Sequence, residues 1–274
     1  MILVWASLVV VAAAAIGIAA MLFVRRRAPE GSYFADGDRA AGVFGVLATG
    51  FAILAGFVVV LAFQSYDDSR SGGEAEARIV AHQFETVQYL AQPARAQLSG
   101  ELVCYARSIV HQEWPRMGSG TVGNAPNPWG LALFRSLRAI EPRTASEQAA
   151  FSKYLDERSE REDARAQRTH GAEGVIPAPL WIVLFLSAAI LFAFMLFFAD
   201  SGERAIVQAT MMGGVMVLVS SLLVLLWFLD NPYHDGIGGL RPVAMQSTLD
   251  VLQHETQEVD AFTPPCDEQG APID

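Results

Sequence analysis

The stretch "AAGVFGVLATGFAILAGFVVVLAF" (residues 40–63) contains no charged residue. An α-helix needs about 20 mainly apolar residues to cross a hydrocarbon core of about 30 Å. Three other uncharged stretches, 2–24, 175–199 and 205–229, reach that length. Because the bilayer core offers no water to backbone N–H and C=O groups, such segments must satisfy them internally as helices. The sequence therefore predicts an all-α polytopic membrane protein with four membrane helices.

The second membrane stretch has two faces of different bulk. Small residues recur at helical spacing on one face, which we expect to pack closely against another helix. This helix-packing face comprises Gly42, Gly45, Thr49, Ala52 and Gly56. The opposite, bulky stripe either meets lipid or lines a narrow apolar constriction. The fourth stretch carries "MMGG" (211–214), which suits a partner for the packing face.

Arginines close to the membrane stretches predict the orientation. Basic residues of short loops remain in the cytoplasm, whereas long domains cross largely regardless of charge. The topology-determining arginines Arg25, Arg26 and Arg27 follow the first stretch, and the other short loop contains Arg204. We therefore expect the N-terminus, the 64–178 domain and the tail outside the cytoplasm. The first stretch lacks the leading positive charge of a signal peptide, so we expect an uncleaved helix.

The predicted organisation alternates membrane helices with extramembrane parts. Its parts are membrane helix 1 (1–24), a short basic loop (25–39), membrane helix 2 (40–63), a helical-bundle domain (64–178), membrane helices 3 (179–199) and 4 (205–229), an amphipathic tail (230–262) and a disordered acidic end (263–274). Apolar residues three and four apart in 74–92, and again from Leu98 to Ile109, predict a helical hairpin that turns at Pro93, and Pro115 is expected to end its second helix. "TASE" (144–147) is typical of a capping box opening a longer helix. Met245, Leu249, Leu252 and Val259 form an apolar stripe that needs a surface to cover it.

Chemistry-bearing residues are sparse. No nucleophile–base arrangement or phosphate loop appears, so we expect no enzyme and no cofactor. His82 with Glu85, and His111 with Glu113, would lie several turns apart in such a hairpin, which favours ordinary histidines over a metal site. We expect Cys104 to be a core thiol and Cys266 a free tail thiol, with one bridge between them as the alternative if that side is oxidising. None of the four spans holds an ionisable residue, which disfavours a proton-coupled pump or a voltage sensor.

Four arginines fall on one face of the long helix before membrane helix 3: Arg158, Arg161, Arg165 and Arg168. Acidic residues surround them, so a solvated helix with i,i+4 ion pairs is the simpler interpretation. The functional alternative is a surface that attracts anions or lipid head groups at a membrane mouth.

Several stretches together resemble the bestrophin-like domain family of bacterial and plant membrane proteins. They are "GVFGVLATGFAILAGFVVVLAFQSYDDSR" (42–70), "YARSIVHQEWPRM" (105–117), "PAPLWIVLFLSAAILFAFMLFF" (177–198) and "LDNPYHDGIGG" (229–239). Bestrophins are pentameric anion channels with a neck lined by apolar residues of the second helix. The resemblance implies a constriction at Phe44, Phe51, Leu54 and Val58. Bestrophins keep the domain between helices two and three in the cytoplasm, whereas the arginine count places it outside.

Two functional hypotheses follow. The first is an oligomeric ion channel in the lipid bilayer, built from several copies of this chain, with its apolar constriction on membrane helix 2. The second is a non-conducting envelope scaffold or assembly factor, whose helical domain and acidic tail bind another envelope protein. Neither hypothesis involves nucleic acid, because the chain has no long basic patch.

Overall fold

The computed structural model describes residues 2–120, 127–258 and 262–273 of the 274-residue chain. The chain divides into two compact units. The membrane unit comprises Met1–Gln64, Val175–Asp230 and Asp235–Gly238. The extramembrane unit comprises Ser65–Gly174, Asn231–His234 and Gly239–Asp274. Among the described residues all regular elements are helical, which confirms the predicted all-α class.

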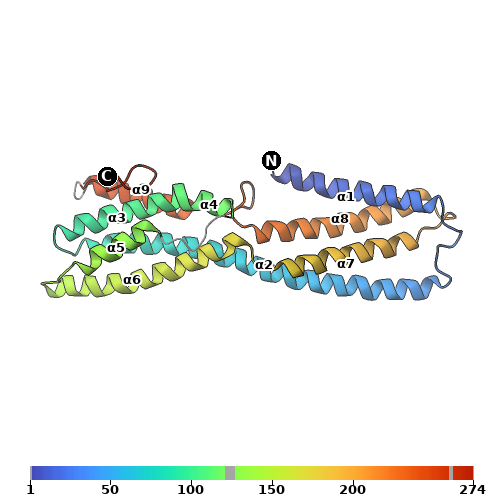
Figure 1. Cartoon of the computed structure of the whole chain (residues 1–274), viewed down its shortest axis with the longest axis horizontal. Helices are drawn as coiled ribbons and strands as arrows, with labels where there is room; N and C mark the ends of the chain where they lie inside the picture. The colour runs from blue at the N-terminus through green and yellow to red at the C-terminus, as the bar shows by residue number, and fades with distance from the viewer. Residues whose placement is uncertain (1, 121–126, 259–261, 274) are drawn as a thin grey trace. The chain divides into compact units, whose positions relative to one another are not determined.

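Four helices are long and apolar enough to cross a bilayer: α1 (Ile2–Arg25), α2 (Gly37–Val87), α7 (Ala178–Phe197) and α8 (Ala205–Asp230). In the membrane unit α1, α7, α8 and the first part of α2 run side by side (Figure 1). Helix α2 does not end with its apolar segment but continues as one helix of 51 residues into the extramembrane unit. Each of the four membrane helices predicted from the sequence is therefore present.

Glycines allow α1 and α8 to approach closely. A Cβ on Gly17 would lie 2.5 Å from Met216 Cγ, and one on Gly213 would lie 3.0 Å from Ile18 Cδ1. Close approach of backbones at small residues is the usual way that helices associate in lipid. The "MMGG" segment was expected to meet the small face of α2, but its Gly213 packs against α1 instead.

The ends of the membrane helices are tied by polar contacts. The Asp230 carboxylate accepts hydrogen bonds from the backbone N–H groups of Val175 and Ile176 at 2.7 and 2.8 Å, and from Trp181 Nε1 at 3.2 Å. Its contacts join the end of α8 to the start of α7. At the other end Arg25 donates to the backbone carbonyls of Ser201 and Glu203, which ties the two short loops together.

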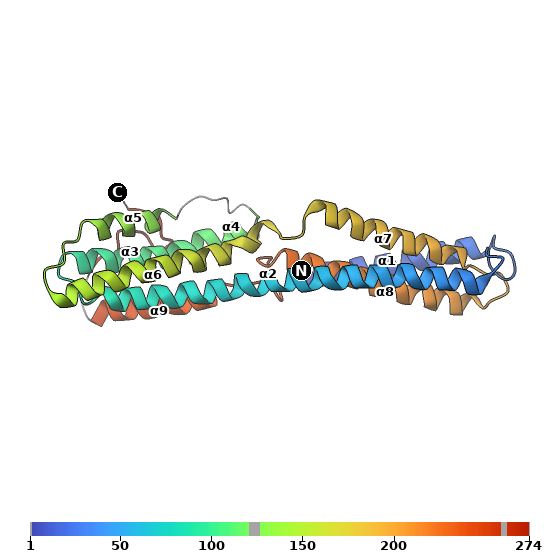
Figure 2. The same cartoon turned by 90° about the horizontal axis from the view of Figure 1, so that it is seen from below.

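The extramembrane unit is a helical bundle around one core. It contains the last part of α2, α3 (Ala94–Ser108), a π-helical turn η1 (Ile109–Glu113), α4 (Trp114–Gly118), α5 (Pro128–Arg138), α6 (Ala145–His170), a 3₁₀ turn η2 (Gly171–Glu173) and α9 (Val243–Glu258). Figure 2 shows α2, α6 and α9 running along the bundle. The apolar stripes predicted on the hairpin are buried in this core except for the exposed Ala91, and Met245, Leu249 and Leu252 of α9 are buried there too. Val259 of the same predicted stripe lies outside the described residues.

Two predicted helix ends have different outcomes. The capping box is confirmed, because the Thr144 hydroxyl accepts from Glu147 N–H while the Glu147 carboxylate accepts from Thr144 N–H. Pro115 was expected to end a helix, but the chain stays helical to Gly118. Proline has no N–H for the carbonyl of residue 111, and the backbone widens into the π turn just before it, where Trp114 N–H bonds to Ile109 C=O.

The C-terminal segment is ordered on the bundle rather than disordered as the sequence predicted. Cys266 forms a disulfide with Cys104 of α3, with 5.8 Å between their Cα atoms, and both residues are buried. Trp129 Nε1 donates to Gly270 C=O at 2.7 Å, and Arg107 donates to Asp267 C=O at 3.0 Å. The expected free thiols are therefore replaced by the disulfide, the alternative that requires an oxidising compartment. The tail is too polar to form a core of its own, and the disulfide and the hydrogen bonds to its backbone carbonyls hold it on the bundle.

We expect Cys266→Ser to loosen the tail and to lower the free energy of unfolding of the extramembrane unit by about 2–4 kcal/mol, because a long covalent loop is lost. Digestion of the purified protein with a glutamate-specific protease should then cleave the tail after Glu268 sooner than in the wild type. Cys104→Ser is the matched variant and should behave alike. Two alkylatable thiols in unreduced, denatured wild type would contradict this prediction.

Candidate functional site

Helix α2 turns part of its bulky stripe inward within the membrane unit. Phe51 and Val58 are buried, and they pack with Ala55 and Ala62 against Leu184 and Leu191 of α7 and Leu226 of α8. Phe44 and Leu54 are partly buried against the same cluster. Of the four residues expected to form a constriction, two are therefore buried in the protomer and two are partly buried.

The opposite face of α2 is open in the protomer. All five members of the expected helix-packing face are exposed, and no heavy atom lies within 4 Å of a Cβ built on Gly42, Gly45 or Gly56. Bulky apolar side chains are also exposed on this open side of α2, among them Val46, Ile53 and Phe57. Val46, Ile53 and Phe57 are 73%, 56% and 68% exposed. A small-residue face set with exposed apolar side chains is suited to contact a second copy of the chain or to line a path between copies.

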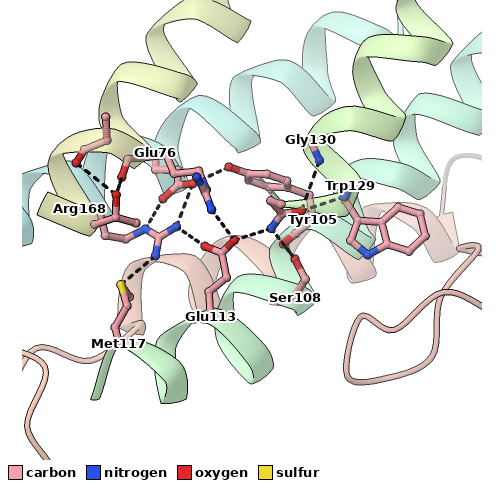
Figure 3. Close-up of polar contacts among 12 residues, drawn as sticks. Glu76, Tyr105, Ser108, Glu113, Met117, Trp129, Gly130 and Arg168 are labelled. Atoms are coloured by element: carbon pink, nitrogen blue, oxygen red, sulfur yellow. Dashed lines mark hydrogen bonds and ion pairs between the residues drawn. The ribbon is translucent and has the colours of Figure 1, made fainter. Parts of the chain in front are cut away.

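The arginines of α6 form a different kind of site in the extramembrane unit. Arg161 and Arg168 are buried, Arg165 is partly buried, and only Arg158 makes the expected surface i,i+4 pair, with Glu162 at 2.6 Å. Figure 3 shows Arg168 between the carboxylates of Glu76 on α2 and Glu113 at the end of η1. This set, together with Arg165, is called the ion cluster below.

Every charge of the ion cluster has a partner. Arg168 Nη2 donates to Glu113 Oε2 at 2.7 Å, and its Nε donates to Glu76 Oε2. Arg165 Nη2 donates to Glu113 Oε1 at 2.9 Å. Two carboxylates thus balance two guanidinium groups, and the Tyr105 hydroxyl adds a hydrogen bond to Glu76 at 2.5 Å.

Neutral residues extend the cluster in both directions. Asn127 Nδ2 donates to Glu113 Oε1 and to Ser108 Oγ, both at 2.9 Å, while its Oδ1 caps α5. About two turns before Arg168 on α6, Arg161 Nη1 donates to Gln83 Oε1 at 2.7 Å. Glu76 and Gln83 on α2 therefore meet Arg168 and Arg161 on α6 in antiparallel register.

The electrostatics follow from this pairing. Burial alone would raise the pKa of Glu113, but the Arg168 and Arg165 guanidinium groups outweigh burial and lower it. Burial would lower the pKa of Arg168, whereas Glu76 and Glu113 raise it. Burial and the Glu76 carboxylate raise the pKa of Tyr105 well above its ordinary value. Glu113, Arg165 and Arg168 therefore stay charged and paired at neutral pH.

This arrangement does not support the anion-attracting surface that the sequence suggested for α6. Removing one partner of a buried ion pair leaves an uncompensated buried charge, which costs about 3–5 kcal/mol. The ion cluster therefore stabilises the packing of α2, η1 and α6 against one another. Sequence reasoning missed Glu76, although Glu76 and Gln83 are polar residues seven apart on the apolar stripe of α2, a spacing that marks them for the same interior face.

The described residues hold no group of three or more His, Cys, Asp or Glu side chains that could bind a metal ion. His82 and His111 are exposed, while Glu113 is committed to the ion cluster. The histidine–glutamate pairs of the sequence are therefore not brought together.

The Bestrophin-like domain model matches residues 8–243 of the chain. The chain belongs to the bestrophin-like family. Solved bestrophin homologues from Klebsiella pneumoniae share the fold of this bestrophin-like protein. One mutant structure has a TM-score of 0.69 at 13% identity and covers 91% of this chain and 99% of its own; a second has a TM-score of 0.67 at 16% identity, with 93% and 99% covered. None of the curated proteins compared with this chain matches it. It is a membrane protein, and the match extends through both units.

We expect Glu113→Gln to destabilise the extramembrane unit at pH 7 by about 3 kcal/mol, because Arg168 and Arg165 lose their shared charge partner. Since the pKa of Glu113 is lowered in the folded protein, its charge stabilises the fold above the unfolded value of about 4.3 and that stabilisation is lost as the pH falls below it. Thermal unfolding of the variant should therefore vary less between pH 5 and pH 3 than that of the wild type.

Glu162→Gln is the matched control, because Glu162 makes only an exposed pair with Arg158. A surface pair contributes less than about 1 kcal/mol, so this variant should unfold like the wild type. Equal unfolding temperatures for the two variants at pH 7 would refute the structural role of the ion cluster.

Proposed function

We propose that this bestrophin-like protein assembles with copies of itself into a membrane channel whose path follows the exposed face of α2. The observation that supports it is the two-faced α2, with one stripe buried against α7 and α8 and the other open. Family membership supports an oligomer and a non-enzymatic role. The membrane part of α2 holds no ionisable residue from 40 to 63, so a narrow point there would gate by excluding water from an apolar ring.

The constriction is assigned to Val46, Ile53 and Phe57 rather than to the bulky stripe. Phe51 and Val58 are 7% and 2% exposed and serve the protomer's interior. Phe57 is 68% exposed, and Ile53, one turn before it on the same side of the helix, is 56% exposed, so the two side chains can form one apolar surface. Phe44 and Leu54, being partly buried, stay secondary candidates.

We expect the purified oligomer to pass current in planar bilayers, and Phe57→Ala to increase single-channel current several-fold because the apolar ring becomes wider. Phe51→Ala is the matched control, since it removes the same ring from the buried face and should lower stability without widening the path. Absence of current from well-folded wild-type oligomer would overturn the proposal, and so would an increase with Phe51→Ala alone.

The scaffold hypothesis has less support, because it relied on a free acidic tail. Residues 262–273 are bonded to α3 and α5 instead. An envelope partner would need to recognise the folded tail.

We further propose that the N-terminus, the extramembrane unit and the tail lie outside the cytoplasm. Two independent features support this orientation. Four arginines lie in loop 25–39, and short loops rich in arginine stay inside. The Cys104–Cys266 disulfide requires an oxidising compartment.

Two engineered cysteines test the orientation. Ser152 of α6 and Ser201 of the loop between α7 and α8 are both exposed. In intact cells a membrane-impermeant maleimide should label Ser152→Cys, whereas Ser201→Cys should react only after permeabilisation. The reverse pattern would place the extramembrane unit in the cytoplasm, as in bestrophins.

A further inference from the structure

A pocket of about 520 Å³ lies in the extramembrane unit between α2, α4 and the start of α9. Its lining comes from the segment 66–74 of α2, from Trp114 and from residues 239–247, all of which belong to that unit. Neither the ion cluster nor the exposed apolar side chains of the membrane part of α2 contribute to it.

Two hydrogen bonds hold the walls of this pocket in place. Trp114 Nε1 donates to Leu240 C=O at 3.0 Å, which fixes the segment before α9 against α4. Thr248 Oγ1 donates to Ala77 C=O at 3.2 Å, which fixes α9 against α2. Arg241 directly follows Leu240, so its backbone is positioned at the pocket before any ligand arrives.

The pocket carries an excess of positive charge. Its lining contains Arg70, Arg241 and, as its one acid among the described residues, Glu74. Arg70 Nε donates to Glu74 Oε1 at 3.1 Å, whereas the terminal Nη groups of Arg70 donate to no described residue. Arg241 has neither a hydrogen bond nor an ion pair with a described residue. One guanidinium is therefore balanced inside the protein, and the other is left to bind an anion.

The start of α9 adds backbone donors to the same pocket. The first bond of this helix runs from Gln246 N–H to Pro242 C=O at 2.8 Å, so the N–H groups of Val243, Ala244 and Met245 have no acceptor within the helix. A helix N-terminus carries partial positive charge and favours an anion. Arginine beside such donors suits an anion with several acceptor oxygens, because its planar fork can bind two of them at once.

The position of the pocket along α2 suggests how the anion is presented. Tyr66 and Arg70 follow Phe63, the last residue of the uncharged stretch, by three and seven positions on one helix. At 1.5 Å a residue they lie about 5 and 10 Å beyond the apolar segment, where the head groups of a bilayer lie outside its hydrocarbon core. The remaining wall is apolar and includes Leu240 and Val243.

We propose that this pocket binds a phosphate group, presented by the head group of an anionic phospholipid. Arg241 and the first N–H groups of α9 would hold the phosphate oxygens, and the apolar wall would contact the rest of the lipid. Free inorganic phosphate offers the same oxygens without the apolar part. Glu74 opposes an anion, so the affinity reflects Arg241 and α9 against this one carboxylate.

The test measures binding to purified, delipidated full-length protein by native mass spectrometry, with phosphatidylglycerol and phosphatidylcholine as probes. The protein should retain phosphatidylglycerol in preference to phosphatidylcholine. Arg241→Gln should weaken phosphatidylglycerol binding about tenfold, since a hydrogen bond to a charged group is worth at least that factor. Arg241→Lys should weaken it less, because the charge stays but the fork is lost. Glu74→Gln should strengthen binding.

Arg78→Gln is the matched control, because Arg78 is an exposed arginine of α2 outside the lining and its loss changes the net charge equally. This variant should bind phosphatidylglycerol like the wild type. Arg241 is also exposed, so its substitution should leave the unfolding temperature of the ligand-free protein unchanged.

Inorganic phosphate separates the two sources of the group. Preference for phosphatidylglycerol identifies a lipid ligand. A rise in unfolding temperature with inorganic phosphate over chloride of equal ionic strength, lost in Arg241→Gln and without that lipid preference, identifies free phosphate. The proposal is overturned if neither effect occurs, or if Arg241→Gln and Arg78→Gln weaken binding equally.

Discussion

The burial of one stripe of α2 is the constraint on which both units depend. In the membrane unit the stripe is apolar, with Phe51, Ala55 and Val58 against α7 and α8. In the extramembrane unit the stripe of the same helix mixes Val80 and Phe84 with the polar Glu76 and Gln83. A helix presents residues to one side at every third and fourth position, so the side that packs in each unit leaves the other side open. The exposed face of α2 is thus a consequence of how its buried face packs.

The two units accommodate ionisable side chains in different ways. Lipid excludes water, so the membrane spans avoid ionisable side chains, and Asp230 appears only where α8 ends and N–H groups of residues 175 and 176 reach its carboxylate. The extramembrane bundle buries charge but pairs it, with Arg168 between two carboxylates. Such a cluster specifies which faces of α2, η1 and α6 meet, since any other register would leave a buried charge alone. The disulfide then holds the polar tail to α3.

The polar features of the membrane unit gather at the loops between its helices. Arg25 donates to the backbone carbonyl of Ser201, and the Asp200 carboxylate accepts from Gly31 N–H, so hydrogen bonds join the two short loops.

The amino-acid sequence by itself determined the four membrane helices, the helical hairpin and the capping box, because each depends on local length, periodicity or a contact within four residues. It also carried the family resemblance. Only the tertiary structure decided which face of α2 is buried, that Arg168 is paired with Glu76, and that Cys104 meets Cys266. The ion pair joins residues that are 92 positions apart in the sequence, and the disulfide joins residues that are 162 positions apart. A periodic pattern predicts which residues share a helix face, but it does not predict what that face packs against.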